Sequence, residues 1–303
     1  MKLRWRLVAA TMAALFASEL APFLALPGRA ANVAVVSSGI CRSPAHSALA
    51  AKLARDIQAA RRGRVSTAAV RVDAPGRRLE CWLHGARHFD SASVVKVIIL
   101  AALLRKAADQ HRHLTDAEAA QASAMITYSE NDAASALWAQ LGHNYLQHFL
   151  DLAGMRQTAL GPAGSWGLTQ ITAGDEVLLL RLLLAPNPVL DTSARDYALR
   201  LMAHVIPAQR WGIPAGAPAS LTVHLKNGWL PLHAHGWRVH SIGCFTGRGG
   251  GYSIVVLTQD NPTTTYGIRT IEAIANAIER DLNPAATSVI PPSEPPRSFR
   301  RHA

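Results

Sequence analysis

The segment from Ser93 to Ala107 constrains the fold more than any other part of the sequence, because it is apolar almost all round. Its valine, isoleucine and leucine residues follow one another without the polar stripe of a surface helix. Such a helix has to be buried by other elements on every side. A chain of 303 residues that is 49% hydrophobic and 17% charged can build the core this requires, and its composition excludes wholesale disorder.

Around this central helix, the hydrophobic periodicity predicts an α+β protein. Helical spacing covers Ser47–Arg61 and Tyr266–Leu282, and the sequence from Leu114 to His204 is helical throughout. Strands are predicted at Ser66–Val72, Leu79–Leu83, Leu221–Leu225, Val239–Phe245 and Tyr252–Thr258. We therefore expect a five-stranded antiparallel sheet, flanked by N- and C-terminal helices, with an inserted all-helical lobe.

The predicted elements divide the chain into two lobes. We assign residues 45–90 and 213–282 to the sheet lobe, and residues 91–212 to the helical lobe that begins with the central helix. The crevice between two lobes is the natural place for a site.

Both ends of the chain differ from this pattern. Residues 1–30 begin with Lys2, Arg4 and Arg6, continue with an apolar stretch and end in small residues, which is typical of a secretory signal peptide. An uncleaved N-terminal anchor is the alternative, although Glu19 and Pro22 argue against a clean span. Residues 283–303 are rich in proline and then arginine, and they are predicted to be a disordered tail.

Export predicts an oxidising compartment, where the three cysteines can form a disulfide. We expect Cys41 to pair with Cys81 and Cys244 to be a buried thiol. The net charge of +11 first points to nucleic acid, but the basic residues are scattered, and no aromatic residues are placed among them to form a stacking platform. We therefore expect no nucleic-acid partner. The His-x-His pairs 111/113 and 233/235 lack a third ligand at a convincing spacing, so we predict no metal and no cofactor.

The first chemical motif is Ser93-Val94-Val95-Lys96, at the start of the central helix. Residues three apart share a helix face, so the Lys96 amine can reach the Ser93 hydroxyl. The free N–H groups of a helix start favour a developing negative charge. Burial of Lys96 would disfavour its charged form and make it a plausible base. A chance pair is the alternative.

Two further motifs lie at predicted lobe junctions. In Tyr128-Ser129-Glu130-Asn131, Ser129 could relay a proton and Asn131 could hold a substrate amide, whereas helix capping is the plainer interpretation. In Lys226-Asn227-Gly228-Trp229, the lysine would place a positive charge over the site, and Gly228 would let a substrate backbone approach. An ordinary strand end is the alternative for that motif.

Taken together and in this order, the three motifs resemble those of the penicillin-recognising serine enzymes. The chain is similar to the class A β-lactamase family and its serine-hydrolase relatives from Ala45 to Leu282. The segments that carry this resemblance are Phe89–Lys96, Met125–Ser135, Gln209–Gly216 and Leu225–Trp229.

The resemblance implies a role for each motif residue. Ser93 would attack a carbonyl and become acylated, while Lys96 takes its proton directly or through water. Ser129, held near Lys226, would return a proton to the leaving amine. Asn131 would bind the substrate's side-chain amide.

The last motif would complete the substrate site. The backbone N–H groups of Ser93 and Trp229 would form an oxyanion hole. Asn227 replaces a hydroxyl residue that helps to bind the β-lactam carboxylate in the family, and Trp229 adds a bulky ring where a small residue is usual.

One departure from the family concerns hydrolysis of the acyl-enzyme. A class A enzyme carries a glutamate on a loop after the second motif, and this glutamate activates the water that frees the serine. Here the corresponding stretch from Leu152 to Gly174 contains no Asp or Glu. Because loss of a positioned base costs ~10²–10⁴-fold in its step, we expect slow deacylation.

These observations favour an exported, extracytoplasmic serine hydrolase that opens an amide or ester through an acyl-enzyme on Ser93. A β-lactam is the family's default substrate, which would connect the chain with the antibiotic response, and a peptidoglycan-like peptide or small ester competes with it. The alternatives are a penicillin-binding protein that traps the acyl group and a non-enzymatic extracellular binding module. We expect a monomer without a stable membrane span in the mature chain.

Overall fold

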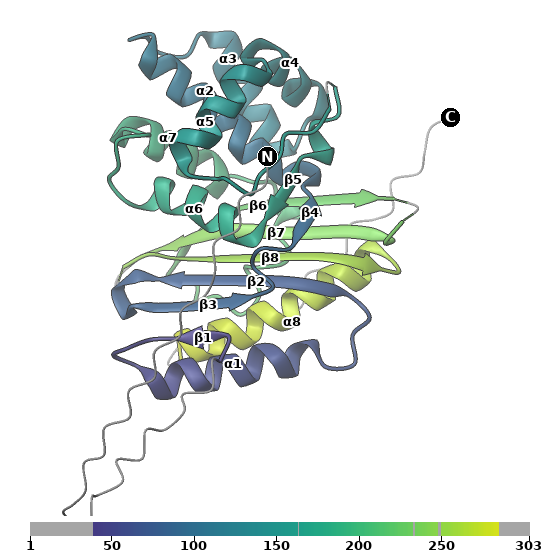
Figure 1. Ribbon diagram of the computed structural model, residues 1–303. Helices are drawn as coiled ribbons and strands as arrows, with labels where there is room; N and C mark the ends of the chain where they lie inside the picture. Colours follow the sequence, from purple (N-terminus) through teal and green to yellow (C-terminus); the bar gives the residue numbers. More distant parts are fainter. Residues whose placement is uncertain (1–38, 163, 233, 248–249, 285–303) are drawn as a thin grey trace, which may run out of the picture. The chain divides into compact units, whose positions relative to one another are not determined.

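The computed structural model describes residues 39–284 except 163, 233 and 248–249. Its main sheet is antiparallel, with six strands in the order β1-β3-β2-β8-β7-β6 (Figure 1). The strands are β1 (Cys41–Arg42), β2 (Thr67–Ala74), β3 (Leu79–Leu83), β6 (Thr222–Pro231), β7 (Trp237–Thr246) and β8 (Tyr252–Asn261). The prediction of five strands was wrong by one, because the two residues of β1 are too few to leave a periodic pattern.

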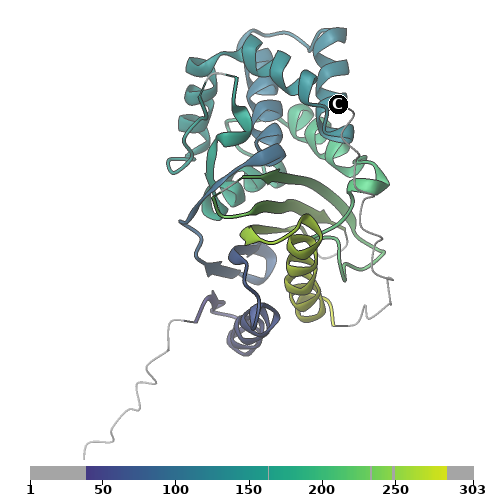
Figure 2. The same ribbon diagram turned by 90° about the vertical axis from the view of Figure 1, so that its right-hand side faces the viewer.

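Two helices from opposite ends of the described chain lie side by side on one face of this sheet (Figures 1 and 2). They are α1 (Ser47–Arg61) and α8 (Thr264–Leu282), and Asp56 of α1 accepts a 3.0 Å hydrogen bond from Arg280 of α8. In α8, buried isoleucines recur at positions 268, 271, 274 and 278, which is the stripe that a helix needs to pack on a sheet. Helix α6 (Ala173–Leu184) packs on β2 and β8.

Helix α2 (Val95–Asp109) forms the centre of the helical region, as predicted from its apolar surface. Every residue from Val94 to Leu104 is buried. Around it are packed α4 (Asn131–Leu141), α5 (His143–Ala153) and α7 (Thr192–Ala203), and α3 (Asp116–Ser123) packs on α4. Lys96 in its first turn, and Ser93 in the turn that leads directly into it, are therefore held by a rigid, deeply packed element.

A second, two-stranded sheet ties the segment before α2 to its surroundings. It pairs β4 (His88–Asp90) with β5 (Gln170–Thr172), two strands that the sequence analysis did not predict. Arg238 on β7 donates to the Asp90 carboxylate at 2.8 Å, and His240 Nε2 lies 2.8 Å from the Asp90 carbonyl oxygen. The chain thus enters α2 from a segment fixed to both the main sheet and β5.

The three cysteines behave as predicted from the sequence. Cys41 and Cys81 form a disulfide between the paired strands β1 and β3, and Cys244 is a buried free thiol on β7. Among the described residues, no helix has the length and apolar character that crossing a bilayer requires.

Some of the predicted segments remain predictions. The signal segment 1–30 lies outside the described residues, as does the predicted tail apart from Asn283 and Pro284. The division into lobes at residues 90/91 and 212/213 also stays a prediction.

Candidate functional site

The first turn before α2 presents Ser93. It is the short 3₁₀ turn η2 (Ala92–Val94), and Ala92 there has φ 47°, a left-handed conformation that non-glycine residues seldom adopt. Such a conformation costs on the order of 1 kcal/mol and has to be held by its surroundings. Ser93 is half-buried, and its hydroxyl makes no hydrogen bond to another described side chain or backbone group. The hydroxyl is therefore available for a bound molecule.

Lys96, one helical turn further on, is fully buried and contacts the second motif. Its Nζ donates to the Ser129 carbonyl oxygen at 2.6 Å, to Ser129 Oγ at 3.2 Å and to Asn131 Oδ1 at 2.8 Å. Ser129 follows the π-helical turn η3 (Ala124–Tyr128) and has φ 62°, so the backbone turns its carbonyl and hydroxyl toward the same amine.

The third motif reaches the same serine from the sheet. Lys226 on β6 is fully buried, and its Nζ donates to Ser129 Oγ at 3.0 Å and to the Asn227 carbonyl oxygen at 2.9 Å. The hydroxyl of Ser129 thus lies between two lysine amines that come from different elements. The capping interpretation of Ser129 is wrong, because the N-cap of α4 is Glu130 and no side chain caps that helix start.

The two amines share one poorly solvated space, which changes their acidity. Burial lowers the pKa of Lys96 to about 8, and the charge of Glu130 opposes this shift only in part. Burial also lowers the pKa of Lys226 well below its usual range, and the nearby charge of Lys96 adds to the effect. A neutral amine, which a base requires, is therefore accessible near neutral pH.

Gly228 allows β6 to lie against the first turn of α2. A Cβ on Gly228 would lie 2.9 Å from the backbone nitrogen of Ser93 and 3.0 Å from that of Val94, closer than side-chain carbons approach backbone atoms. The space beside Gly228 is thus taken up by the chain itself, and the approach of a substrate backbone to this strand stays a prediction. β6 is the last strand of the sheet, so this close approach joins the sheet edge to the helix start.

Asn227 does not face the other motif residues with its side chain. The side chain is fully buried, and its Nδ2 donates to the carbonyl oxygens of Gln209 at 2.8 Å and Trp211 at 2.9 Å. It fixes the 209–211 segment to β6, and a contact of its amide with substrate stays a prediction. The next residue, Trp229, is half-buried, with its ring 5.9 Å from that of Trp211.

Trp166 is a residue near these groups that the sequence analysis missed. It begins the 3₁₀ turn η4 (Trp166–Leu168), and its ring centroid lies 4.8 Å from Lys96 Nζ, a cation–π contact. The indole Nε1–H donates to Ser135 Oγ on α4 at 3.1 Å. No local motif marks Trp166, because the pairing of β4 with β5 brings its loop beside Lys96.

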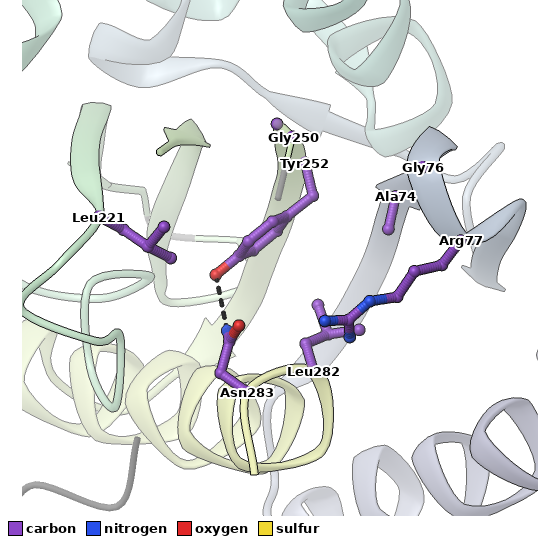
Figure 3. A pocket seen from close by; sticks show the side chains of 9 residues that line it. Ala74, Gly76, Arg77, Leu221, Gly250, Tyr252, Leu282 and Asn283 are labelled. Carbon is purple, nitrogen blue, oxygen red and sulfur yellow. Dashed lines mark hydrogen bonds between the residues drawn. The ribbon is translucent and has the colours of Figure 1, made fainter. Parts of the chain in front are cut away.

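A separate cavity of about 70 Å³ shares no residue with this cluster (Figure 3). Arg77 after β2, Tyr252 at the start of β8 and Asn283 after α8 contribute to its lining. The Tyr252 hydroxyl accepts a 3.1 Å hydrogen bond from Asn283 and donates at 2.6 Å to Glu279, a buried carboxylate on α8. We find no chemistry there that connects with the Ser93 cluster.

Solved structures share this fold. The TLA-1 extended-spectrum β-lactamase superposes with a TM-score of 0.69 and 16% identity, covering 77% of this chain and 98% of its own. A class A β-lactamase from Bacteroides cellulosilyticus superposes with a TM-score of 0.68 and 17% identity, and the match covers 80% of this chain and 99% of that one. A variant of PBP-A was solved as an acyl-enzyme complex with penicillin G. It superposes with a TM-score of 0.66 and 18% identity, and the match covers 77% of this chain and 97% of that one.

The sequence itself carries the family assignment. No curated protein matches it. The sequence profile of the Beta-lactamase enzyme family, however, matches residues 117–282, which is more than half of the chain and includes the second and third motifs. The chain therefore belongs to the Beta-lactamase enzyme family, with the fold of class A β-lactamases.

Proposed function

We propose that the protein is a serine hydrolase that opens an amide or ester through an acyl-enzyme on Ser93. The observation that carries this proposal is the position of Ser129 Oγ, 3.2 Å from Lys96 Nζ and 3.0 Å from Lys226 Nζ, beside the helix turn that presents Ser93. The Ser129 hydroxyl lies between two buried amines, and one of them, Lys96, follows the free Ser93 by one helical turn. This arrangement is suited to moving protons to and from a reacting centre.

Acylation would proceed in two proton transfers. Ser93 Oγ adds to the substrate carbonyl carbon while its proton passes to Lys96, directly or through water. The bond to the leaving group then breaks, and Ser129 delivers a proton to that group and is resupplied by Lys226. Asn131, whose Oδ1 accepts from Lys96, keeps its Nδ2 for a substrate amide.

The negative charge on the carbonyl oxygen needs donors at the sheet edge. In this proposal the backbone N–H groups of Ser93 and Trp229 would fill this role, which the close approach of β6 to the backbone nitrogen of Ser93 supports. A donor of this kind typically contributes about 3 kcal/mol to transition-state stabilisation.

Hydrolysis of the acyl-enzyme would be slow. No carboxylate is available from Leu152 to Gly174, and the ring of Trp166 lies over Lys96 from this stretch. This observation favours a second candidate function, a penicillin-binding protein that traps the acyl group, and the PBP-A variant caught as a penicillin G acyl-enzyme is a fold relative with that chemistry.

A β-lactam is the first substrate to test, and a peptidoglycan-like peptide or small ester is the next. We also propose that the protein acts outside the cytoplasm. The Cys41–Cys81 disulfide supports export, because disulfides persist in oxidising compartments.

The proposal is tested by incubating the protein with penicillin G and following intact mass and released product. We expect one covalent adduct per chain, absent from Ser93→Ala and slow to clear. Steady product release would favour the hydrolase and a lasting adduct the acyl-trapping protein. If neither penicillin G nor an activated ester modifies the chain, the Ser93 proposal is wrong and a binding module becomes the better interpretation.

A further inference from the structure

The turn η4 runs directly alongside the proposed nucleophile. The backbone N–H of Ser91 donates to the Thr169 carbonyl oxygen at 2.8 Å, and its hydroxyl lies 3.4 Å from the carbonyl oxygens of Trp166 and Gly167. The Trp166 ring meanwhile contacts Lys96. Because Ser91 precedes Ser93 by two residues and Lys96 follows it by three, Trp166 extends along the flank of Ser93.

The ring is held in this position from the opposite side. Its Nε1–H donates to Ser135 Oγ at 3.1 Å, so the indole connects η4 with α4. Asn131 and Ser135, one turn apart on α4, are both exposed. Lys96, which lies between these residues and the sheet, nevertheless has no exposed surface. The indole is therefore part of what separates Lys96 from bulk water.

We propose that the indole of Trp166 covers Lys96 and thereby keeps hydrolytic water away from the acyl group on Ser93. This inference rests on the proposed function, and it makes Trp166 a positioning residue that biases the site toward retaining an acyl group. A ring over the amine leaves the proton transfer from Ser93 possible, because that hydroxyl lies on the same helix. The ring does, however, block the side of the Lys96 amine that a water molecule would have to reach in order to transfer a proton to it.

The covered step is hydrolysis. A water oxygen would add to the ester carbonyl carbon while one water proton passes to neutral Lys96. The bond between the carbonyl carbon and Ser93 Oγ would then break, and Oγ would take the proton back from Lys96, which releases a carboxylic acid and regenerates both residues. No carboxylate occurs from Leu152 to Gly174, so this inference assigns the role of base for that water to Lys96.

The test compares the lifetime of the penicillin G adduct among variants, measured by intact mass after removal of free penicillin. Trp166→Ala removes the cover, and we expect the adduct to clear roughly tenfold faster, less than a positioned carboxylate would give because Lys96 alone activates the water. Trp166→Phe keeps an aromatic ring but loses the Nε1–H donor, and Ser135→Ala keeps the indole but removes the acceptor of that hydrogen bond. The adduct lifetimes of both variants should therefore fall between those of the wild type and Trp166→Ala.

A control and a second readout separate covering from general loosening. Leu168→Ala alters an exposed residue of the same turn, 37% accessible, and should leave the adduct lifetime unchanged. Trace acetylation of Lys96 across pH, quantified by peptide mass, reports whether a reagent dissolved in water reaches the neutral amine. In Trp166→Ala, the titration of Lys96 should move above pH 8 because hydration favours the ammonium, and at a pH high enough to leave the amine neutral in both proteins Lys96 should be labelled faster than in the wild type.

The outcomes are distinct. Faster clearing together with faster Lys96 labelling in Trp166→Ala supports the cover. Equal adduct lifetimes in the wild type, Trp166→Ala and Ser135→Ala overturn it while leaving the proposed function intact, and unchanged labelling of Lys96 overturns it as well. A wild-type chain that never gains an adduct refutes the proposed function and, with it, this inference.

Discussion

At the scale of single residues, Lys96 links the buried environment of the site to a pH dependence. A base has to be neutral, and burial lowers the Lys96 pKa to about 8, so the acylation rate should rise with pH through about 8 and level off above it. Lys96→Arg should abolish this rise and slow acylation by ~10²–10⁴-fold, because a guanidinium cannot give up its proton. Stopped-flow or mass-based acylation rates from pH 6 to 10 measure both effects.

The matched control for this prediction is Lys106→Arg, because Lys106 lies on the same helix and donates to the Gln140 carbonyl oxygen at the surface. It should keep the wild-type profile. A flat pH profile in the wild type would contradict the assignment of Lys96 as the base.

Glu279 gives a residue-scale prediction about stability. Burial raises the pKa of this carboxyl from 4.5 to about 7, while its hydrogen bonds with Tyr252 and Asn283 oppose the shift. The folded state therefore holds a proton that the unfolded chain releases above pH 4.5, so stability is greatest below that pH and falls as pH rises toward 7. The loss is on the order of 3 kcal/mol.

Glu279→Gln keeps an oxygen that can accept from Tyr252 and Asn283 but does not titrate. The variant should lose this fall in stability, so its advantage over the wild type should grow between pH 4.5 and 7 in urea unfolding. Parallel pH dependences for the two proteins would show that the Glu279 carboxyl is not the cause.

The same scale shows which site residues a sequence can reveal. Ser93, Lys96, Ser129 and Lys226 stand out in the sequence because each belongs to a short motif whose spacing has a chemical reason. The structure brings Lys96, Ser129 and Lys226 into contact, while the catalytic roles of the four residues stay predictions. The bonds of Asn227 to the 209–211 segment were not predicted, because a strand position does not say whether an amide meets a substrate or a neighbouring loop. Trp166 could not be found, because its contact with Lys96 depends on a loop that long-range strand pairing positions.

At the scale of elements, the approach of β6 to η2 depends on Gly228. Gly228→Ala would place a methyl group against the Ser93 and Val94 backbone nitrogens and the Ser91 carbonyl oxygen, so the strand or the turn has to shift. We expect a loss of about 1–3 kcal/mol in unfolding free energy and a larger relative loss of acylation rate, because the shift occurs at the reacting centre. Urea unfolding and adduct formation at saturating penicillin G measure the two losses.

Gly250→Ala is the comparison for Gly228→Ala, because a Cβ at Gly250 meets no atom within 4 Å, although its φ of 95° makes any side chain strained. It should cost stability without changing acylation. If Gly228→Ala acylates at the wild-type rate, the closeness of β6 to Ser93 does not matter for the reaction.

Prediction of elements succeeded where periodicity had room to develop. Helix α1 was predicted with its observed bounds, Ser47–Arg61, and β3 with its own, Leu79–Leu83. The strands β1, β4 and β5 have two or three residues each and leave no pattern, yet the pairing of β4 with β5 fixes the segment before Ser93 and the segment after Trp166. Such short strands form only because distant parts of the chain meet, so single-sequence patterns do not contain them.

At the scale of the whole molecule, the Cys41–Cys81 disulfide ties the first described strand to the sheet across a separation of 40 residues. A crosslink over this loop length restricts the unfolded chain by about 4 kcal/mol in the chain-entropy account. Cys41→Ser should therefore lower the unfolding free energy by about that amount, and reductant should lower the wild type similarly, as measured by urea unfolding with and without dithiothreitol. Cys244→Ala, which removes the buried free thiol, should remain sensitive to reductant. If reductant changes the unfolding free energy of neither the wild type nor Cys244→Ala, the disulfide contributes nothing to stability.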